Sequence, residues 1–66
     1  MIKNTIGTNA GKIWKLLDES GELSVKQIKV ELELTEKDLY LALGWLARET
    51  KLSFVENKKD LMVALI

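Results

Sequence analysis

Three glutamates, Glu31, Glu33 and Glu36, lie close together and are the densest group of side chains that could perform acid–base chemistry. A pair of carboxylates can cleave a glycosidic bond when one acts as the acid and the other as the base or nucleophile. That reaction needs a cleft that holds the substrate, and a chain of 66 residues offers little material from which to build one. We therefore interpret the three glutamates as solvated surface charges.

Nucleophilic and metal chemistry also lack their usual residues, because the sequence contains neither His nor Cys. The serines Ser20, Ser24 and Ser53 have no recognisable activating base, and Ser24 has a capping role instead. The segment from Gly7 to Gly11 does not resemble a phosphate-binding loop, since no Gly-Lys-Ser/Thr sequence follows it. The sequence predicts a protein that is not an enzyme, with no cofactor and no metal.

Length and charge limit which classes of protein remain possible. Sixty-six residues predict a single domain over residues 1–66, and the 10 basic and 10 acidic side chains cancel. Strong nucleic-acid binders usually carry a basic excess, which this chain lacks as a whole. The longest apolar run, Leu61 to Ile66, is far too short to span a membrane, and the N-terminus does not read as a signal peptide. The absence of Cys agrees with a cytoplasmic protein. Acidic residues offset the lysines of the first helix, and its apolar stripe is needed for the core, so no membrane binding is expected.

The residue pattern divides into helices followed by a hairpin. Apolar residues at helical spacing predict a first helix from about Thr5, with Thr5 or Thr8 as its cap, to Ser20, and Gly21 as its C-terminal cap. A short extended link at Glu22-Leu23 precedes a second helix, and Ser24 with Gln27 forms a capping box at its start.

The second half continues with a helix and two strands. Thr35 and Asp38 resemble a cap, and the apolar stripe beyond them predicts a helix to Glu49 or Thr50. Two strands, 52–56 and 61–66, follow with a turn at 57–60, and the extended link can pair with them. The expected fold class is α+β and mostly α: three helices and a small antiparallel sheet around one core.

Particular segments resemble the winged helix-turn-helix superfamily. Gly21-Glu22-Leu23-Ser24-Val25 resembles the entry to the second helix of many bacterial regulators, and Leu43–Glu49 with Lys51-Leu52 resembles the end of their recognition helix. More narrowly, Ala10–Trp14 and Ala42–Glu49 look like a family of small bacterial and archaeal winged-helix proteins of unknown function. The resemblance implies that the helix over 35–49 is the recognition helix and that the C-terminal hairpin is the wing.

One hypothesis follows from how such domains bind duplex DNA. The outer face of the recognition helix enters the major groove, and the wing contacts the backbone. The residues that would lie there are Lys37, Tyr40, Gly44, Arg48, Lys58 and Lys59. The segment from Thr35 to Thr50 carries two basic and three acidic side chains, which weakens this hypothesis, and wing lysines also serve simply to protect a strand edge.

The alternative hypothesis is a protein-interaction or homodimerisation module that has lost DNA binding. Leu41 and Trp45 fall on or beside the outer face of the recognition helix, although Trp45 could equally pack against the wing or the first helix. The last strand has apolar residues on both of its faces, whereas a strand with one face in water should alternate. The interface residues expected from this hypothesis are Leu41, Trp45, Met62, Ala64 and Ile66.

Overall fold

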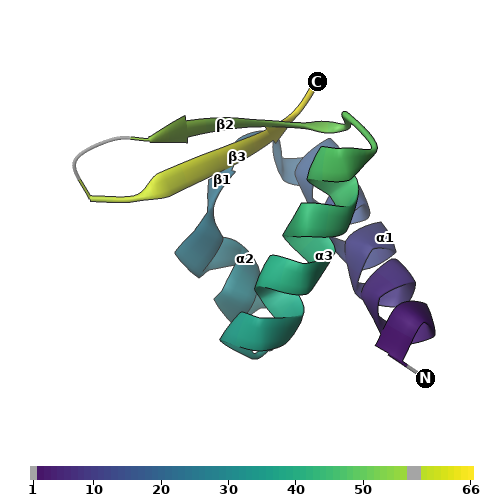
Figure 1. Ribbon diagram of the computed structural model, residues 1–66. Coiled ribbons are helices and arrows are strands. Elements are labelled where there is room, and N and C mark those ends of the chain that lie inside the picture. The colour runs from purple at the N-terminus through teal and green to yellow at the C-terminus, as the bar shows by residue number, and fades with distance from the viewer. Residues whose placement is uncertain (1, 57–58) are drawn as a thin grey trace.

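The computed structural model describes the backbone of residues 2–56 and 59–66 and the side chains of residues 5–56 and 59–66. The elements follow the order helix, short strand, two helices and hairpin. They are α1 (Ile2–Ser20), β1 (Leu23–Ser24), α2 (Val25–Leu32), α3 (Glu36–Arg48), β2 (Leu52–Glu56) and β3 (Leu61–Leu65). Figure 1 shows the helices gathered on one side of the sheet, while the far end of the β2–β3 hairpin projects beyond them. The predicted fold class is confirmed.

The first helix starts earlier than the sequence predicts and ends where expected. It begins at Ile2, so Thr5 and Thr8 lie inside it and the prediction of either as its cap is wrong. The two glycines of its first turns do not prevent helix formation, because the apolar face is held by tertiary packing. At the other end, Gly21 has a φ of 76° and its N–H donates to the carbonyl of Leu17 at 2.8 Å. That left-handed cap was predicted.

Side chains that precede α2 and α3 fix where these helices begin. Ser24 Oγ accepts a bond from the N–H of Gln27, and Gln27 Oε1 accepts one from the N–H of Ser24, which confirms the capping box. Thr35 Oγ1 accepts from the N–H of Asp38 at 3.2 Å, as predicted for α3. Between the two helices, Glu33 adopts the left-handed conformation with a φ of 52° and closes α2.

The sheet joins the extended link to the hairpin. Its strand order is β1-β3-β2, and both pairs are antiparallel. Leu23 lies opposite Val63, and Ser24 lies opposite Met62, so the link pairs with the hairpin as expected but is shifted by one residue from Glu22-Leu23. Phe54 also lies opposite Val63, on the other side of the central strand. The wing is therefore tied to the start of α2 through β3.

A single core holds the helices and the sheet together. Ile13, Ile28 and Val63 are completely buried and come from α1, α2 and β3. Helix α3 contributes its whole apolar stripe, which was predicted from its spacing. The buried residues of that stripe are Leu39, Ala42, Leu43 and Leu46. With this face fixed inward, the opposite face of α3 is left to solvent.

Candidate nucleic-acid interface

The outer face of α3 presents the residues that the sequence placed on it. Lys37, Tyr40, Gly44 and Arg48 are all exposed, and Tyr40 keeps 56% of its surface. Their spacing of three or four residues sets them along one side of the helix. Ala47 is exposed as well, one turn beyond Gly44. Gly44 and Ala47 therefore lie between Tyr40 and Arg48 along the helix.

Two of the three acidic residues of this segment lie off the outer face, and the third is paired with a lysine of α2. Helical periodicity places Asp38 and Glu49 on the opposite flank, beside Trp45, and Asp38 is half-buried. Glu36 in the first turn pairs with Lys29 of α2, at 3.4 Å between Oε1 and Nζ. The net negative charge of residues 35–50 therefore misrepresents the outer face, whose cations Lys37 and Arg48 have no acidic neighbour along the helix side that they share.

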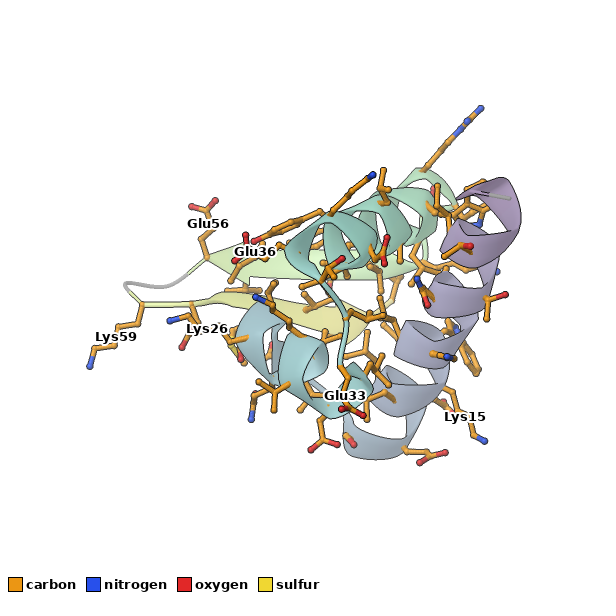
Figure 2. The ribbon with its side chains drawn as sticks, turned by 90° about the horizontal axis from the view of Figure 1, so that it is seen from below. Lys15, Lys26, Glu33, Glu36, Glu56 and Lys59 are labelled. Atoms are coloured by element: carbon orange, nitrogen blue, oxygen red, sulfur yellow. The ribbon has the colours of Figure 1, made fainter. Side chains whose placement is uncertain are left out.

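The wing carries charges of both signs. Lys59 is exposed, and in Figure 2 it projects beyond the helices while Glu56 lies across the hairpin from it. Asp60 forms an ion pair with Lys26 of α2, at 3.8 Å between Oδ1 and Nζ. Lys58, which the sequence also assigned to this surface, lies outside the described residues. The described part of the wing offers a cation to a partner but no basic cluster.

The residues expected at a protein interface are distributed over two regions. Leu41 and Trp45 are half-buried, and Trp45 packs against the core next to Trp14 of α1. Trp45 is therefore partly covered by the first helix, one of the two arrangements that the sequence left open. Met62 and Ala64 are half-buried on the sheet face turned away from Val63, and Ile66 is 77% exposed. The expected interface residues therefore divide between α3, which carries Leu41 and Trp45, and the C-terminal strand and its end.

Trp14, Ala47 and Val55 are exposed in the structure, although no residue pattern predicted a functional role for them. Trp14 retains 42% and Val55 retains 53% of its surface. The signal for Trp14 was present in the helical spacing, because Trp14 lies three residues after Gly11 and seven after Gly7 on one side of α1. Exposed aromatic and β-branched side chains on regular elements are candidates for contact with a partner.

The order of three helices and a hairpin, with an exposed second helix of the helix-turn-helix unit, defines a winged helix-turn-helix domain. A family described as "Winged helix-turn-helix domain (DUF2582)" matches residues 1–65, and the chain belongs to that family.

Two similar proteins extend this assignment. An uncharacterized protein of Methanocaldococcus jannaschii, MJ1608, is 39% identical to this chain. The matched region spans 91% of this chain and 89% of MJ1608. The solution NMR structure of BT2368 from Bacteroides thetaiotaomicron superimposes with a TM-score of 0.86 at 32% identity. The superimposed region covers 98% of this chain and 79% of the BT2368 chain. The family match and the structural match confirm the fold and the resemblance, and neither relative's name states an activity.

The described residues contain neither a metal-ligand cluster nor a membrane-spanning helix. Within residues 2–56 and 59–66, no three His, Cys, Asp or Glu side chains are arranged to hold a metal ion. None of the helices in the same residues is long and apolar enough to cross a bilayer.

Proposed function

We propose that the domain is a non-catalytic binding module that contacts duplex DNA through the outer face of α3 and the wing. The observation that carries this proposal is the segregation of charge on α3. Lys37 and Arg48 share the exposed side with Tyr40 and Gly44, while the acids lie on the other flank or are paired. A helix in the major groove contacts phosphates and base edges through cationic and polar side chains, and Lys37, Tyr40 and Arg48 supply such groups.

The charges also set the expected strength of binding. Each neutralised phosphate releases counterions, and the logarithm of the affinity falls with the logarithm of salt concentration by about 0.9 per phosphate. Contacts from Lys37, Arg48 and Lys59 give a slope of about −2.7. Binding should therefore be weak at physiological salt and clear at low salt. A second module, whether another copy or another protein, would raise the affinity by linking two such surfaces.

A charge-matched pair of variants tests the proposal. Lys37→Ala with Arg48→Ala removes two cations from the outer face of α3. Lys12→Ala with Lys15→Ala removes two from α1, and Figure 2 shows Lys15 on the side of the molecule away from Lys59. Fluorescence anisotropy of a labelled duplex at low salt should show at least tenfold weaker binding by the α3 variant and little change by the α1 variant. Equal losses in both would reduce the interaction to nonspecific charge attraction and overturn the proposal.

A protein-binding role is the second candidate, and exposed apolar side chains of the hairpin favour it. Val55 lies opposite Met62, and Ser53 lies opposite Ala64, all on the sheet face turned away from the core. Val55 and Ile66 are exposed and Met62 and Ala64 are half-buried, so this group of side chains is predominantly apolar. Under this alternative, Val55→Ser would release a bound partner while the α3 double variant would not.

A further inference from the structure

The two outer strands of the sheet present edges of very different length. The strand order β1-β3-β2 leaves β1 and β2 each with one side that pairs with no other strand in the described residues. Strand β1 has only two residues and continues directly into α2, and a very short edge strand is one way in which proteins prevent unwanted pairing. Strand β2 has five residues, and all except Leu52 are exposed. The outer edge of β2 is therefore the longer of the two edges and the more accessible one.

The hydrogen bond between Ile66 and Lys51 determines which backbone groups of β2 point away from the sheet. The N–H of Ile66 donates to the carbonyl of Lys51 at 3.1 Å, next to the paired residues of β2 and β3. Backbone groups alternate between the two sides of an antiparallel strand, so those of residues 51, 53 and 55 face β3. The N–H and C=O groups of Leu52, Phe54 and Glu56 point outwards instead. Among the described residues, no backbone hydrogen bond joins these outward groups to another element.

Strand β2 also lacks the features that usually keep an edge from pairing. Natural edge strands are commonly protected by lysine, by proline or by a bulge. Residues 52–56 contain neither lysine nor proline, and their only charged side chain is that of Glu56 at the end of the strand. The register with β3 runs through all five pairs without an extra residue on either strand, so there is no bulge. The outer edge of β2 thus offers alternating donors and acceptors in the spacing that another extended strand matches.

Phe54 is incompletely covered at this edge. It lies opposite Val63 and shares a sheet face with it, but Val63 is completely buried and Phe54 keeps 41% of its surface. Val63 has a strand on each side, since it also lies opposite Leu23, whereas Phe54 has a strand on one side only. Directly opposite residues of paired strands have Cβ atoms about 4.5–5.5 Å apart, which is close enough for an apolar side chain to cover the ring.

We propose that the outer edge of β2 is a docking site for an extended segment of a second polypeptide, which adds a fourth strand and sets an apolar side chain opposite Phe54. Main-chain hydrogen bonds supply affinity in this mode of recognition, and the pocket beside the exposed side chain supplies specificity. Glu56 lies in the part of the hairpin that projects beyond the helices, so a strand can reach it (Figures 1 and 2). The proposed DNA contacts come from other residues, so this site goes beyond the proposed function and does not depend on it.

Amide hydrogen exchange with a strand-forming peptide tests the proposal residue by residue. The probe is a peptide with the sequence of residues 51–56, which can form the same strand and carries an apolar aromatic residue. Its binding should slow exchange at the amides of Phe54 and Glu56, whereas the amides of Ser53 and Val55 already face β3 and should change little. The control is the same peptide with every backbone amide N-methylated, which keeps the side chains but removes the donors and should protect nothing. Protection of Phe54 and Glu56 that rises with protein concentration alone also supports the proposal, with a second copy as the added strand.

Substitutions in β2 separate backbone pairing from contact with the sheet face. Phe54→Pro removes an outward N–H and the ring but no hydrogen bond to β3, so an edge strand tolerates it. It should weaken peptide binding about tenfold or more, and Phe54→Lys should do the same by placing a charge at the edge if the proline variant fails to fold. The matched control is Val55→Ser, which shortens an exposed side chain on the opposite sheet face and should leave the affinity nearly unchanged.

Three results would overturn the proposed strand addition. The first is unchanged exchange at Phe54 and Glu56 in the presence of millimolar peptide. The second is equal protection by the N-methylated peptide, and the third is an equal loss of affinity in Val55→Ser and Phe54→Lys. None of these measurements involves DNA, so failure of strand addition leaves the proposed function standing.

Discussion

Ser24 and Gln27 exchange two hydrogen bonds across the start of α2, with lengths of 2.9 Å from Ser24 N and 3.1 Å from Gln27 N. Ser24 is also the last residue of β1 and lies opposite Met62 in the sheet. One buried serine therefore ends a strand and begins a helix, and it connects the helix-turn-helix unit to the wing. The start of α2 and the register of the sheet are set at the same residue.

We expect Ser24→Ala to lower the free energy of unfolding by about 1–2 kcal/mol, the upper part of the range for a lost N-cap. Thr35→Ala removes the exposed cap of α3 and should cost about 0.5–1 kcal/mol. Urea denaturation of both variants, with an unchanged m-value, measures the difference. Equal costs would mean that the position of Ser24 in the sheet adds nothing to its role as a cap.

A buried and an exposed residue of α2 should respond very differently to truncation. Ile28→Ala removes a completely buried side chain and should cost roughly 2–5 kcal/mol, which is most of the stability that a domain of this size can have. Val30→Ala removes a side chain that is 75% exposed and should change stability by less than about 0.5 kcal/mol. Thermal unfolding followed by circular dichroism compares them. A large loss in Val30→Ala would place that residue in an interface that the monomer does not reveal.

Substitution by alanine should change the free energy of unfolding in opposite directions at two glycines. Gly21→Ala forces an alanine into a φ of 76° and should destabilise the domain by about 1–2 kcal/mol. Gly44→Ala lies inside α3 with open space around the new Cβ and should stabilise it by up to about 1 kcal/mol. Chemical denaturation of the two variants gives both values. A loss of stability in Gly44→Ala would contradict the open surface that the structure shows there.

The ion pair between Glu36 and Lys29 should affect DNA binding more than folding. Both groups are on the surface, where such a pair contributes about 0–1 kcal/mol, so Glu36→Gln should leave the melting temperature nearly unchanged. The same change removes a negative charge next to the face that carries Lys37. Under the proposed function it should strengthen duplex binding severalfold at low salt, as measured by anisotropy. Weaker binding would mean that Glu36 itself contacts the partner.

Much of the helix-turn-helix unit was predictable because its signals are local. The caps at Ser24 and Thr35 and the left-handed cap at Gly21 depend on residues within three or four positions of each other. The start of α1 was not predicted, because Gly7 and Gly11 weaken the local preference for helix while packing of Ala10, Ile13 and Leu17 restores it. A local signal therefore fails where contacts from other elements outweigh it.

The residues of the candidate site were likewise predictable only where the signal was local. Spacing alone placed Lys37, Tyr40, Gly44 and Arg48 on one side of the recognition helix, because a helix has a fixed period. The sum of charges over residues 35–50 does not by itself describe that side, since it ignores that Glu36 pairs with Lys29, seven residues earlier. The placement of Trp45 was also undecided, because burial depends on whether Trp14 and the N-terminal half of α1 lie beside it.

The number and order of the elements and the apolar stripe of α3 follow from local patterns in the chain, because periodicity and capping act over a few residues. The register of Leu23 against Val63, the partial burial of Trp45 and the exposure of Trp14 depend instead on how the elements pack. Those features arise where segments distant in the chain meet. Their energies depend on which surfaces the folded core leaves uncovered.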